Sequence, residues 1–539
     1  MRRIVIAAIV GVTALVIAGA GGAVPKGDPC VGGPHCYASV QGAIDSAPAG
    51  ATIRIGPGTF SGGVTIIRDV TLIGVNAHAS KVSGGGPVIT IGSTTTAPTV
   101  TLENLTITGG LTTSNPHAPE CGLDVPVCGP GYADSTATGG GIETFTGTTV
   151  TLVDTVVAGN RAAPAQTTQS VKATCAGGPC VAAFGDGAGI DLWGSMTLID
   201  STVSDNHASA AAQSNGGGIA VHSGASLSLK SSHVDGNSAA ATGPSGRFVS
   251  GGGIFVNGGA SLTVDDSSID GNSSLLTNSL ASPFPIQDGN GDSSNSIGGG
   301  LFLSDGSTAS IRNSTVNGNT VSVDTPFNES FGADAALCAC GDVAVTIDHS
   351  QVDGNTMTVK ATGTDFGPDG PAILEADGNH TTITSTHIDG NTGTVTTTGA
   401  TGGLIGSVAF FAGDGDPVTL ANSSNSNNRM TANAPNGAAQ IAGAGLFNNG
   451  PLTIQDSAIS GNHGTASGPT GSSYGGGIVN GFFGGPAQLT LQGSRVTNNV
   501  LSGSAGVSLF GGGIYTVGFP ITLSNSVVAH NAPDDCEGC

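Results

Sequence analysis

The chain has 539 residues, of which 91 are Gly, 9% are charged and 38% are hydrophobic. Its formal net charge of −23 at pH 7 excludes a nucleic-acid-binding protein and a protein held on anionic lipid, because a surface of that sign repels both. The charge is too sparse and the hydrophobic content too high for a disordered chain, so a core can form. Abundant Gly between short runs of Val, Ile and Leu predicts short strands joined by tight turns.

Residues 1–23 have the pattern of a secretory signal peptide. Arg2 and Arg3 precede an apolar run, and the small residues Ala20 and Ala23 offer cleavage sites. The alternative is an uncleaved membrane anchor, for which the apolar run is short. We therefore predict a secreted or cell-surface protein without a membrane span after cleavage. Loss of the two arginines takes the net charge from −23 to −25.

Residues 24–50 are predicted to form an N-terminal cap that contains a short helix. Apolar side chains recur there at the spacing of one helix face, at Val40, Ala43, Ile44 and Ala47. Pro48 and Gly50 end this helix. A helix laid over the open end of a stack of strands shields apolar side chains that otherwise face water.

Residues 51–531 are predicted to form the β-helix, and from about residue 139 a repeat dominates them. Its clearest copy is 251–272, which consists of a Gly cluster, alternating apolar residues and a closing Asn. The closing Asn recurs at Asn160, Asn206, Asn237, Asn272, Asn319, Asn355, Asn391, Asn428, Asn462, Asn499 and Asn531. Units of nearly constant length alternate with connections of variable length. This pattern predicts an all-β fold, a single right-handed parallel β-helix solenoid of about thirteen coils with three short strands each.

The closing Asn has a structural interpretation. Asn tolerates left-handed turn geometry, and its amide can hydrogen-bond to the layers above and below. Eleven repetitions of one residue indicate a ladder of side chains rather than eleven active sites. The Gly clusters are expected to form corners whose backbone angles other residues rarely adopt.

Ten cysteines fall into five close pairs, Cys30/Cys36, Cys121/Cys128, Cys175/Cys180, Cys338/Cys340 and Cys536/Cys539. In an exported chain this predicts local disulfide bonds, including one in the C-terminal tail 532–539. A metal site at the terminal pair is the alternative, but it needs a second pair of ligands nearby.

The repeat and the entry segment resemble a known family. The Gly-Gly-Gly-Ile, Leu-Thr-Val and Gly-Asn motifs of 251–272 are similar to the repeats of polymorphic outer-membrane proteins. Segments 41–44, 56–60 and 70–74 resemble the entry coils of the carbohydrate-active branch of the bacterial pectin-lyase-like superfamily. The resemblance implies a right-handed parallel β-helix, an extracellular location, and either adhesion or polysaccharide chemistry.

The sequence departs from the pectin-acting members of that superfamily. It lacks the Asn-Thr-Asp, Gly-His-Gly and Arg-x-Lys set of polygalacturonases and the Arg-rich site of pectate lyases. Polyuronate carboxylates are bound by Arg or Lys, yet of 14 such residues only 12 remain without Arg2 and Arg3. These departures disfavour an enzyme that acts on pectin.

The best candidate metal ligands are Asp288, Asn290 and Asp292. Oxygen ligands that alternate with Gly suit Ca²⁺, the candidate cofactor of this chain. The segment lacks the Gly and Glu that complete a calcium-binding loop, so an ordinary polar loop is the alternative.

Three other features of the sequence are candidates for a functional role. Asp235 is expected to stack on Asp270, and Asp353 on Asp389, either as acid/base pairs or as ordinary turn residues with side chains in water. An outward column of aromatic residues is expected at Phe255, Phe302, Phe447 and Tyr515. The connections 111–138, 161–189 and 273–300 are expected to emerge along one edge of the solenoid, where a binding site can be built.

The favoured function is a secreted or cell-surface binding module, similar to an adhesin, that contacts an extracellular glycan or protein surface as a monomer. The first alternative is a carbohydrate-active enzyme, namely a polysaccharide lyase, glycoside hydrolase or epimerase. The second is a structural protein of the cell envelope. No catalytic residue is assigned from the sequence. Carboxylates clustered with a basic or His partner would favour the enzyme, whereas an exposed apolar or aromatic strip would favour binding.

Overall fold

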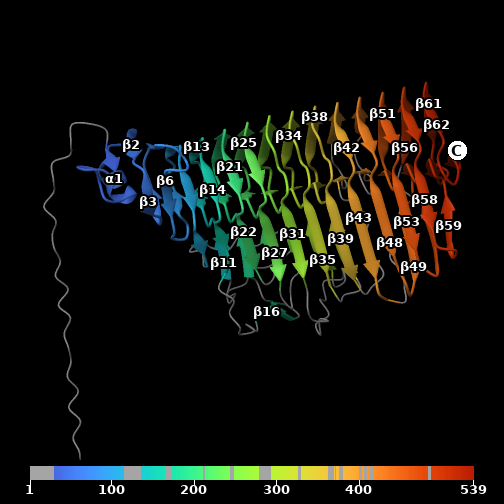
Figure 1. The fold of residues 1–539 in the computed structure, drawn as a ribbon, viewed down its shortest axis with the longest axis horizontal. Coiled ribbons are helices and arrows are strands. Elements are labelled where there is room, and N and C mark those ends of the chain that lie inside the picture. The colour runs from blue at the N-terminus through green and yellow to red at the C-terminus, as the bar shows by residue number, and fades with distance from the viewer. Residues whose placement is uncertain are drawn as a thin grey trace, which may run out of the picture.

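The computed structural model describes residues 29–113, 135–164, 173–175, 178–180, 183–210, 213–242, 248–277, 293–325, 329–361, 370, 372–375, 380–399, 404–405, 410–412, 417–482 and 487–539. These residues form a long stack of parallel strands with one short helix at the N-terminal end (Figure 1). The predicted all-β parallel β-helix is confirmed. The predicted signal peptide, residues 1–23, lies outside the described residues.

The helix α1 spans Val40–Ser46. Ser39 caps it, since its side-chain oxygen accepts a hydrogen bond from the Gly42 N–H at 3.1 Å. Val40, Ala43 and Ile44 are buried and join the main core beside the first strands, β1 (Cys30–Val31), β2 (Ala51–Ile55) and β4 (Val64–Ile66). A disulfide bond between Cys30 and Cys36 closes the loop before the helix.

One complete coil contains five strands rather than the three predicted. In chain order they are β24 (Ile219–Val221), β25 (Ser226–Lys230), β26 (His233–Asp235), β27 (Ser238–Thr242) and β28 (Phe248–Ser250), after which β29 (Ile254–Val256) begins the next coil. The two additional strands lie between the closing Asn237 and the next Gly cluster. The sequence predicts a connection there rather than strands, because Ser238–Thr242 consists of small residues with weak hydrophobic alternation.

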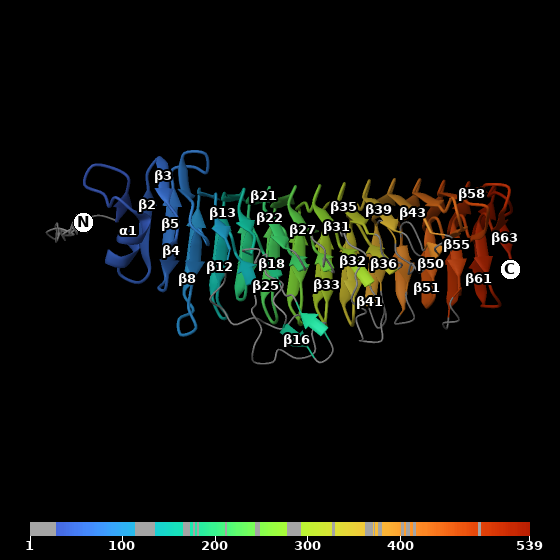
Figure 2. The same ribbon diagram turned by 90° about the horizontal axis from the view of Figure 1, so that it is seen from below.

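Equivalent strands of successive coils pair in parallel and form long sheets (Figure 2). The largest has 15 strands, from β1 to β61 (Ile521–Ser524), and another has 14, from β4 to β63 (Cys536–Glu537). The coil number of about thirteen is not confirmed, because β1, β2, β5 (Val70–Gly74) and β8 (Thr99–Glu103) precede the repeat units in the 15-stranded sheet.

The other faces are shorter sheets. An 11-stranded sheet runs from β10 (Leu111–Thr112) to β58 (Val500–Gly503). A six-stranded sheet runs from β11 (Ser135–Thr138) to β36 (Glu329–Ala333), and a four-stranded sheet from β44 (Leu404–Ile405) to β59 (Val507–Phe510) occupies the same face further along the chain. The narrowest face holds β3 (Gly58–Ser61) to β26 and, later, β42 (His387–Asp389) to β62 (Val527–Ala529). Strands β16 (Ala173–Cys175) and β17 (Gly178–Cys180) form a separate antiparallel hairpin.

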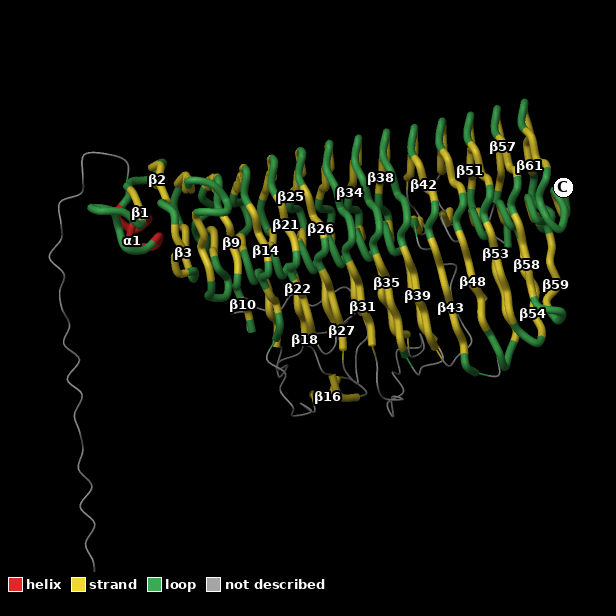
Figure 3. Tube along the Cα trace, viewed as in Figure 1, coloured by secondary structure: helices red, strands yellow, loops and turns green. Residues whose placement is uncertain are grey.

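Two apolar cores run along the stack. The main core is enclosed by the 15-stranded, 14-stranded and narrow faces, with Leu227 and Leu229 of β25 pointing inward while Ser228 between them is partly exposed. A second core of smaller side chains, including Ala239, Val249 and Val321, lies between the 11-stranded sheet and the six- and four-stranded sheets. Each coil is covered mainly by its neighbours, as expected of a solenoid (Figure 3).

The predicted Asn ladder is confirmed. The Asn272 backbone N–H and its Nδ2 donate to Asn319 Oδ1 at 2.9 and 3.1 Å, and Asn272 Nδ2 also donates to the carbonyl of Val234 at 2.7 Å. The pattern continues coil by coil to Asn531, whose N–H donates to Asp535 Oδ1 at 2.8 Å. The Gly cluster makes room for the ladder: Gly251 has φ +58°, and a Cβ at Gly253 would lie 2.8 Å from Asn272 Nδ2.

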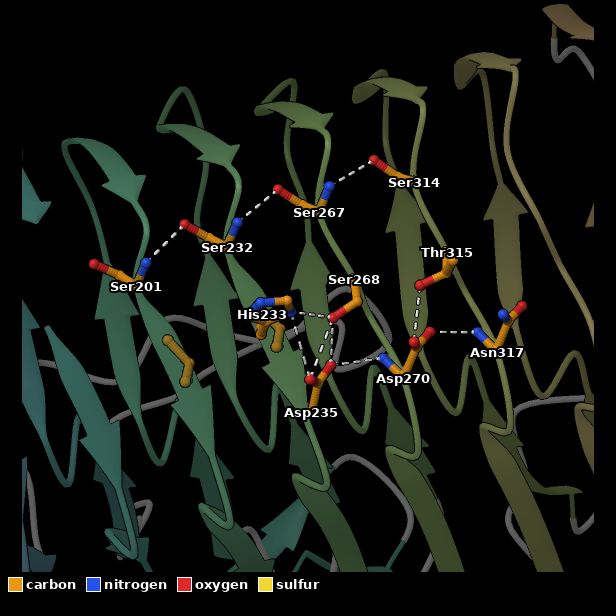
Figure 4. A network of polar contacts seen from close by, with 12 residues as sticks. Ser201, Ser232, His233, Asp235, Ser267, Ser268, Asp270, Ser314, Thr315 and Asn317 are labelled. Atoms are coloured by element: carbon orange, nitrogen blue, oxygen red, sulfur yellow. Dashed lines mark hydrogen bonds and ion pairs between the residues drawn. The ribbon is translucent and has the colours of Figure 1, made fainter. Parts of the chain in front are cut away.

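A second ladder of hydroxyl groups lies at another corner of the coil. The N–H of Ser201 donates to Ser232 Oγ, that of Ser232 to Ser267 Oγ, and that of Ser267 to Ser314 Oγ, at 3.0–3.1 Å (Figure 4). Each Oγ also donates to a carbonyl two residues earlier, as Ser232 does to Lys230 at 2.8 Å. Buried turns therefore keep their polar groups paired in every layer.

Three predicted disulfide bonds are present, Cys30–Cys36, Cys338–Cys340 and Cys536–Cys539. Cys121 and Cys128 lie outside the described residues, as do the side chains of Cys175 and Cys180. Among the described residues, no helix has both the length and the apolar character needed to cross a membrane.

Candidate functional site

The six- and four-stranded sheets meet the 14-stranded sheet at the Gly clusters, and we call this junction the inter-sheet corner. One register column faces it from each side. From the six-stranded sheet come Thr138, Asp186, Asn215, Ser250 and Ile297, which pair in that order. From the 14-stranded sheet come Glu143, Asp191, Ala220, Phe255 and Phe302. The corner is thus polar at its N-terminal end and becomes aromatic along the stack.

Glu143 and Asp191 form the centre of the polar end. Glu143 lies in β12 (Ile142–Thr144) and Asp191 in β19 (Ile190–Leu192), at paired positions of adjacent parallel strands. Their backbones are therefore about 4.8 Å apart. Ile142 and Ile190, one residue earlier, point into the main core, which turns both carboxyl groups toward the corner. Glu143 is 5% exposed and Asp191 is 1% exposed.

Both oxygens of Asp191 are held by aromatic nitrogen atoms. His222 Nε2 lies 2.6 Å from Asp191 Oδ1, and Trp193 Nε1 donates to Asp191 Oδ2 at 3.0 Å. The Trp193 and His222 rings stack at a centroid distance of 4.0 Å with 9° between their planes. Trp193 follows β19 and His222 follows β24, so adjacent coils supply the two rings. A buried carboxylate with two such partners is suited to orient the imidazole.

Asp186 approaches the same place from the other sheet. It ends β18 (Ala183–Asp186), just before the left-handed Gly187 with φ +54°. Asn215, at the end of β23 (Gln213–Asn215), donates from Nδ2 to Asp186 Oδ1 at 3.0 Å. Ser250 in turn donates to Asn215 Oδ1 at 2.6 Å. Asp186 is half-buried, and this chain of amide and hydroxyl groups fixes its orientation.

The carboxyl groups hold protons at unusually high pH. Burial is the main cause that raises the pKa of Glu143 from 4.5 to about 8, and the charge of Asp191 adds to it, against a hydrogen bond with Thr90. Burial also raises the pKa of Asp186 from 3.8 to about 7; His222 and the hydrogen bond from Asn215 lower it, and the charge of Asp191 raises it. At neutral pH the site therefore combines a protonated Glu143 with an Asp186 that can exchange its proton. These are the properties of an acid/base pair.

These two protons make the stability of the fold depend on pH. Both carboxyl groups titrate near pH 4 when unfolded and near pH 7–8 when folded, so the folded chain binds more protons across that range. Their contribution to stability is complete below pH 4 and is lost as the pH rises through the folded pKa values. We expect the melting temperature to fall between pH 5 and pH 8.5, measured by circular dichroism at constant ionic strength. The fall should be shallower in Glu143→Gln, and an unchanged slope would contradict the assignment.

The predicted aromatic column is only partly correct. Phe255, Phe302 and Phe447 do point away from the main core, but they are 6%, 5% and 0% exposed. The six- and four-stranded sheets cover them: Phe248 meets Phe302 edge-on at 6.0 Å, and Phe255 stacks on Phe302 at 5.5 Å. Of the four predicted residues, Tyr515 is the one that remains partly exposed.

The predicted Asp row serves the scaffold. Asp235 Oδ1 accepts from the Ser268 hydroxyl at 2.9 Å and from the Asp270 N–H at 3.1 Å, and Asp270 accepts from Thr315 and Asn317 in the same way (Figure 4). Asp353 accepts from the Asp389 N–H at 2.8 Å. These carboxylates bind the turn of the following coil. They are turn residues, as one of the two interpretations held, but they point to the next layer rather than to water.

The predicted calcium ligands Asp288, Asn290 and Asp292 lie outside the described residues. Most of the connections 111–138, 161–189 and 273–300 also do so. Within the described part of the chain, no group of three or more His, Cys, Asp and Glu side chains is arranged to hold a metal ion.

The sequence pattern did not predict the site at Glu143, Asp186, Asp191 and His222. A signal was present at the position after the apolar residue that follows each Gly cluster. Two consecutive units carry Glu143 and Asp191 there, where later units carry Ala, Phe, Cys, Leu, Val or Tyr. His222 and Asp186 gave no comparable signal, because their proximity depends on the five-strand coil.

Comparison with known proteins supports no assignment to a family. No protein-family model and no curated protein matches the chain. Among solved structures, the chain is similar to a pectin methylesterase mutant in complex with a hexasaccharide, with 11% identity and a TM-score of 0.21. The match covers 52% of this chain and 80% of that one. It transfers neither a substrate nor catalytic residues to this chain.

Proposed function

We propose that this protein is an exported glycoside hydrolase that acts on an uncharged glycan, with Glu143 as proton donor and Asp186 as base. The observation that carries the proposal is the cluster of Glu143, Asp186, Asp191 and His222 at one end of the inter-sheet corner. A raised pKa on two carboxyl groups beside a carboxylate–imidazole pair is typical of catalytic sites. This arrangement favours the enzyme over the binding module.

Hydrolysis of a glycosidic bond requires a proton donor and a base, which Glu143 and Asp186 supply. Glu143 donates its proton to the glycosidic oxygen as the bond from the anomeric carbon to that oxygen breaks. Asp186 takes a proton from the water whose oxygen bonds to the anomeric carbon, so the products are two free sugar ends. The Asp191–His222 pair stabilises the positive charge that develops on the sugar ring, and Trp193 holds this pair in place.

The acidic character of the protein selects against other substrates. Elimination from a uronate requires removal of a proton next to a carboxylate, and a cationic partner must stabilise the resulting charge. The polar end of the corner presents three carboxyl groups instead, and the chain has a net charge of −23. A polyuronate lyase or epimerase is therefore disfavoured, and a neutral glycan fits best.

The test is release of new reducing ends from a panel of neutral polysaccharides, including galactomannan, xyloglucan, xylan and mixed-linkage glucan. The rate of hydrolysis should be bell-shaped in pH, with limbs near pH 7 for Asp186 and near pH 8 for Glu143. Asp186→Asn should remove the acid limb together with most of the activity. Binding of a glycan without hydrolysis at any pH would contradict the hydrolase and favour the binding module.

A further inference from the structure

The inter-sheet corner ends, far from the acid site, in a group of four aromatic side chains that we call the C-terminal aromatic cluster: Tyr474, Phe482, Phe510 and Tyr515. Tyr474 ends β54 (Thr470–Tyr474), Phe510 ends β59, Tyr515 lies in β60 (Ile514–Thr516), and Phe482 follows β55 (Ile478–Asn480). Tyr474 pairs with Phe510 in the four-stranded sheet, in the equivalent of the column that holds Asp186 in the six-stranded sheet.

The four rings form one continuous surface. Tyr474 stacks on Phe510 at 5.4 Å with 14° between planes, and it contacts Tyr515 at 4.6 Å and Phe482 at 5.0 Å. All four are partly exposed, whereas Phe447, which contacts Phe482 at 6.4 Å, is fully buried. The corner is therefore closed by apolar packing at Phe447 and open to solvent at the cluster.

Polar groups surround these rings. Tyr515 pairs with Glu537 of β63, and its pKa is raised by burial, by Tyr474 and by the charge of Glu537. Two phenol hydroxyls and a carboxylate therefore lie beside the aromatic surface. Rings that stack on the C–H face of a sugar, with oxygen atoms nearby for its hydroxyls, are the chemistry that binds neutral glycans. A purely structural closure would bury these rings, as happens at Phe447.

We propose that the C-terminal aromatic cluster is a second glycan-binding site, which holds the same neutral polymer whose hydrolysis is assigned to Glu143 and Asp186. The class of ligand rests on the proposed function. The supporting geometry is the shared corner, in which a single apolar cluster extends from Ala220 to Tyr515. The Glu537 carboxylate beside the cluster disfavours an anionic chain.

The distance between the two sites determines which ligands can bind to both sites at once. From Asp191 in β19 to Tyr515 in β60 there are nine strand steps in the 14-stranded sheet, or roughly 43 Å at the usual strand spacing. A short oligosaccharide reaches one site, whereas a polymer that runs along the outside of the solenoid, past the stretch of the corner that buried aromatic side chains close, reaches both. Simultaneous contact should tighten polymer binding by at least about 100-fold relative to the short ligand.

The binding experiment uses the full chain with Glu143→Gln, so that turnover does not consume the ligand. Affinity electrophoresis in gels containing galactomannan, xyloglucan, xylan or mixed-linkage glucan should show retardation by at least one polymer. Adding Phe510→Ala or Tyr515→Ala should abolish that retardation, and Phe510→Tyr should keep it, because a phenol ring still stacks. Circular dichroism and the melting temperature establish that each variant is folded.

The kinetic experiment uses the chain with an intact Glu143. Phe510→Ala should raise KM for the polymer at least about tenfold, since the second contact is lost, and leave kcat/KM for a short oligosaccharide unchanged. Equal polymer binding by all cluster variants would overturn the proposal. So would sedimentation velocity that shows a dimer lost in Phe510→Ala without any change in glycan binding, because the cluster would then be a surface for self-association.

The two proposals fail in different ways. Hydrolysis of oligosaccharides by the wild type, without polymer retardation of the Glu143→Gln protein, would reject the second site and keep the hydrolase. Polymer binding that depends on Phe510, together with normal turnover in Glu143→Gln, would reject the assigned catalytic residue and keep the second site.

Discussion

Glu143→Gln is expected to lower the rate of glycan hydrolysis by about 100- to 10,000-fold, the range that a positioned acid or base contributes. The amide has nearly the shape of the carboxylic acid, but its N–H groups are too weakly acidic to protonate the leaving oxygen. Because Glu143 is buried beside Asp191, the substitution also removes one ionisable group from a crowded site. The fold should be retained, and initial rates of reducing-end release measure the effect.

Asp270→Asn is the matched control for this substitution. Asp270 is also a partly buried carboxyl group whose pKa is raised by burial, but it lies on the narrow face and accepts hydrogen bonds from Thr315 and Asn317. Its replacement should leave the rate of hydrolysis within about twofold of the wild type, because it serves the scaffold. Equal losses in both variants would show that the first effect is structural and would remove Glu143 from the mechanism.

The second large effect concerns stability, and Asn319→Ala is expected to cost roughly 3 kcal/mol or more. Its side chain is fully buried. Without it, the Asn272 N–H and Nδ2 lose the oxygen that accepts from both at 2.9 and 3.1 Å, and the carbonyl of Ile269 loses its donor at 2.9 Å. Buried groups left without partners carry the full cost of desolvation. The urea concentration at the midpoint of unfolding measures the loss.

Asn317→Ala, two residues away in the same turn, is the control for this substitution. It tests whether the loss of stability comes from the buried Asn ladder or follows from removal of any side-chain amide. Asn317 is partly exposed, and its Oδ1 accepts one hydrogen bond, from the Asp353 N–H at 2.7 Å. Water can replace that contact, so we expect a loss of about 1 kcal/mol or less. If both variants unfold at the same midpoint, the Asn ladder does not stabilise the coil as the hydrogen bonds suggest.

Much of the scaffold could be predicted because the same sequence pattern occurs many times along the chain. The closing Asn, the Gly cluster and the period-2 strands each recur in nearly every coil, so one ambiguous copy does not mislead. The additional strands, such as β27 with its sequence Ser-Ala-Ala-Ala-Thr, were missed because they bury small side chains in a second core. The signal of alternating hydrophobicity is weak when the buried residue is Ala.

The whole site could not be predicted from the sequence, because Asp186 lies at the end of a strand whose weak hydrophobic alternation did not indicate a strand. Asp186 belongs to one of the missed faces, and the turn at Gly187 brings it back toward Asp191. His222 is 31 residues from Asp191 in sequence and adjacent to it only through the stacking of coils. Glu143 and Asp191 could be found by aligning the repeat units, since their position holds acids in these two units and apolar or aromatic residues later.

Trp193 gives the site an intrinsic optical reporter. It is the sole tryptophan of the chain, and its ring stacks on His222 while its nitrogen binds Asp191. The emission of an indole depends on the groups that contact its ring and its nitrogen, so it should change when the position of His222 or Asp191 changes. No other tryptophan contributes to this emission. Binding of a sugar at the polar end of the corner should therefore change the fluorescence emission of the unlabelled protein before any bond is broken.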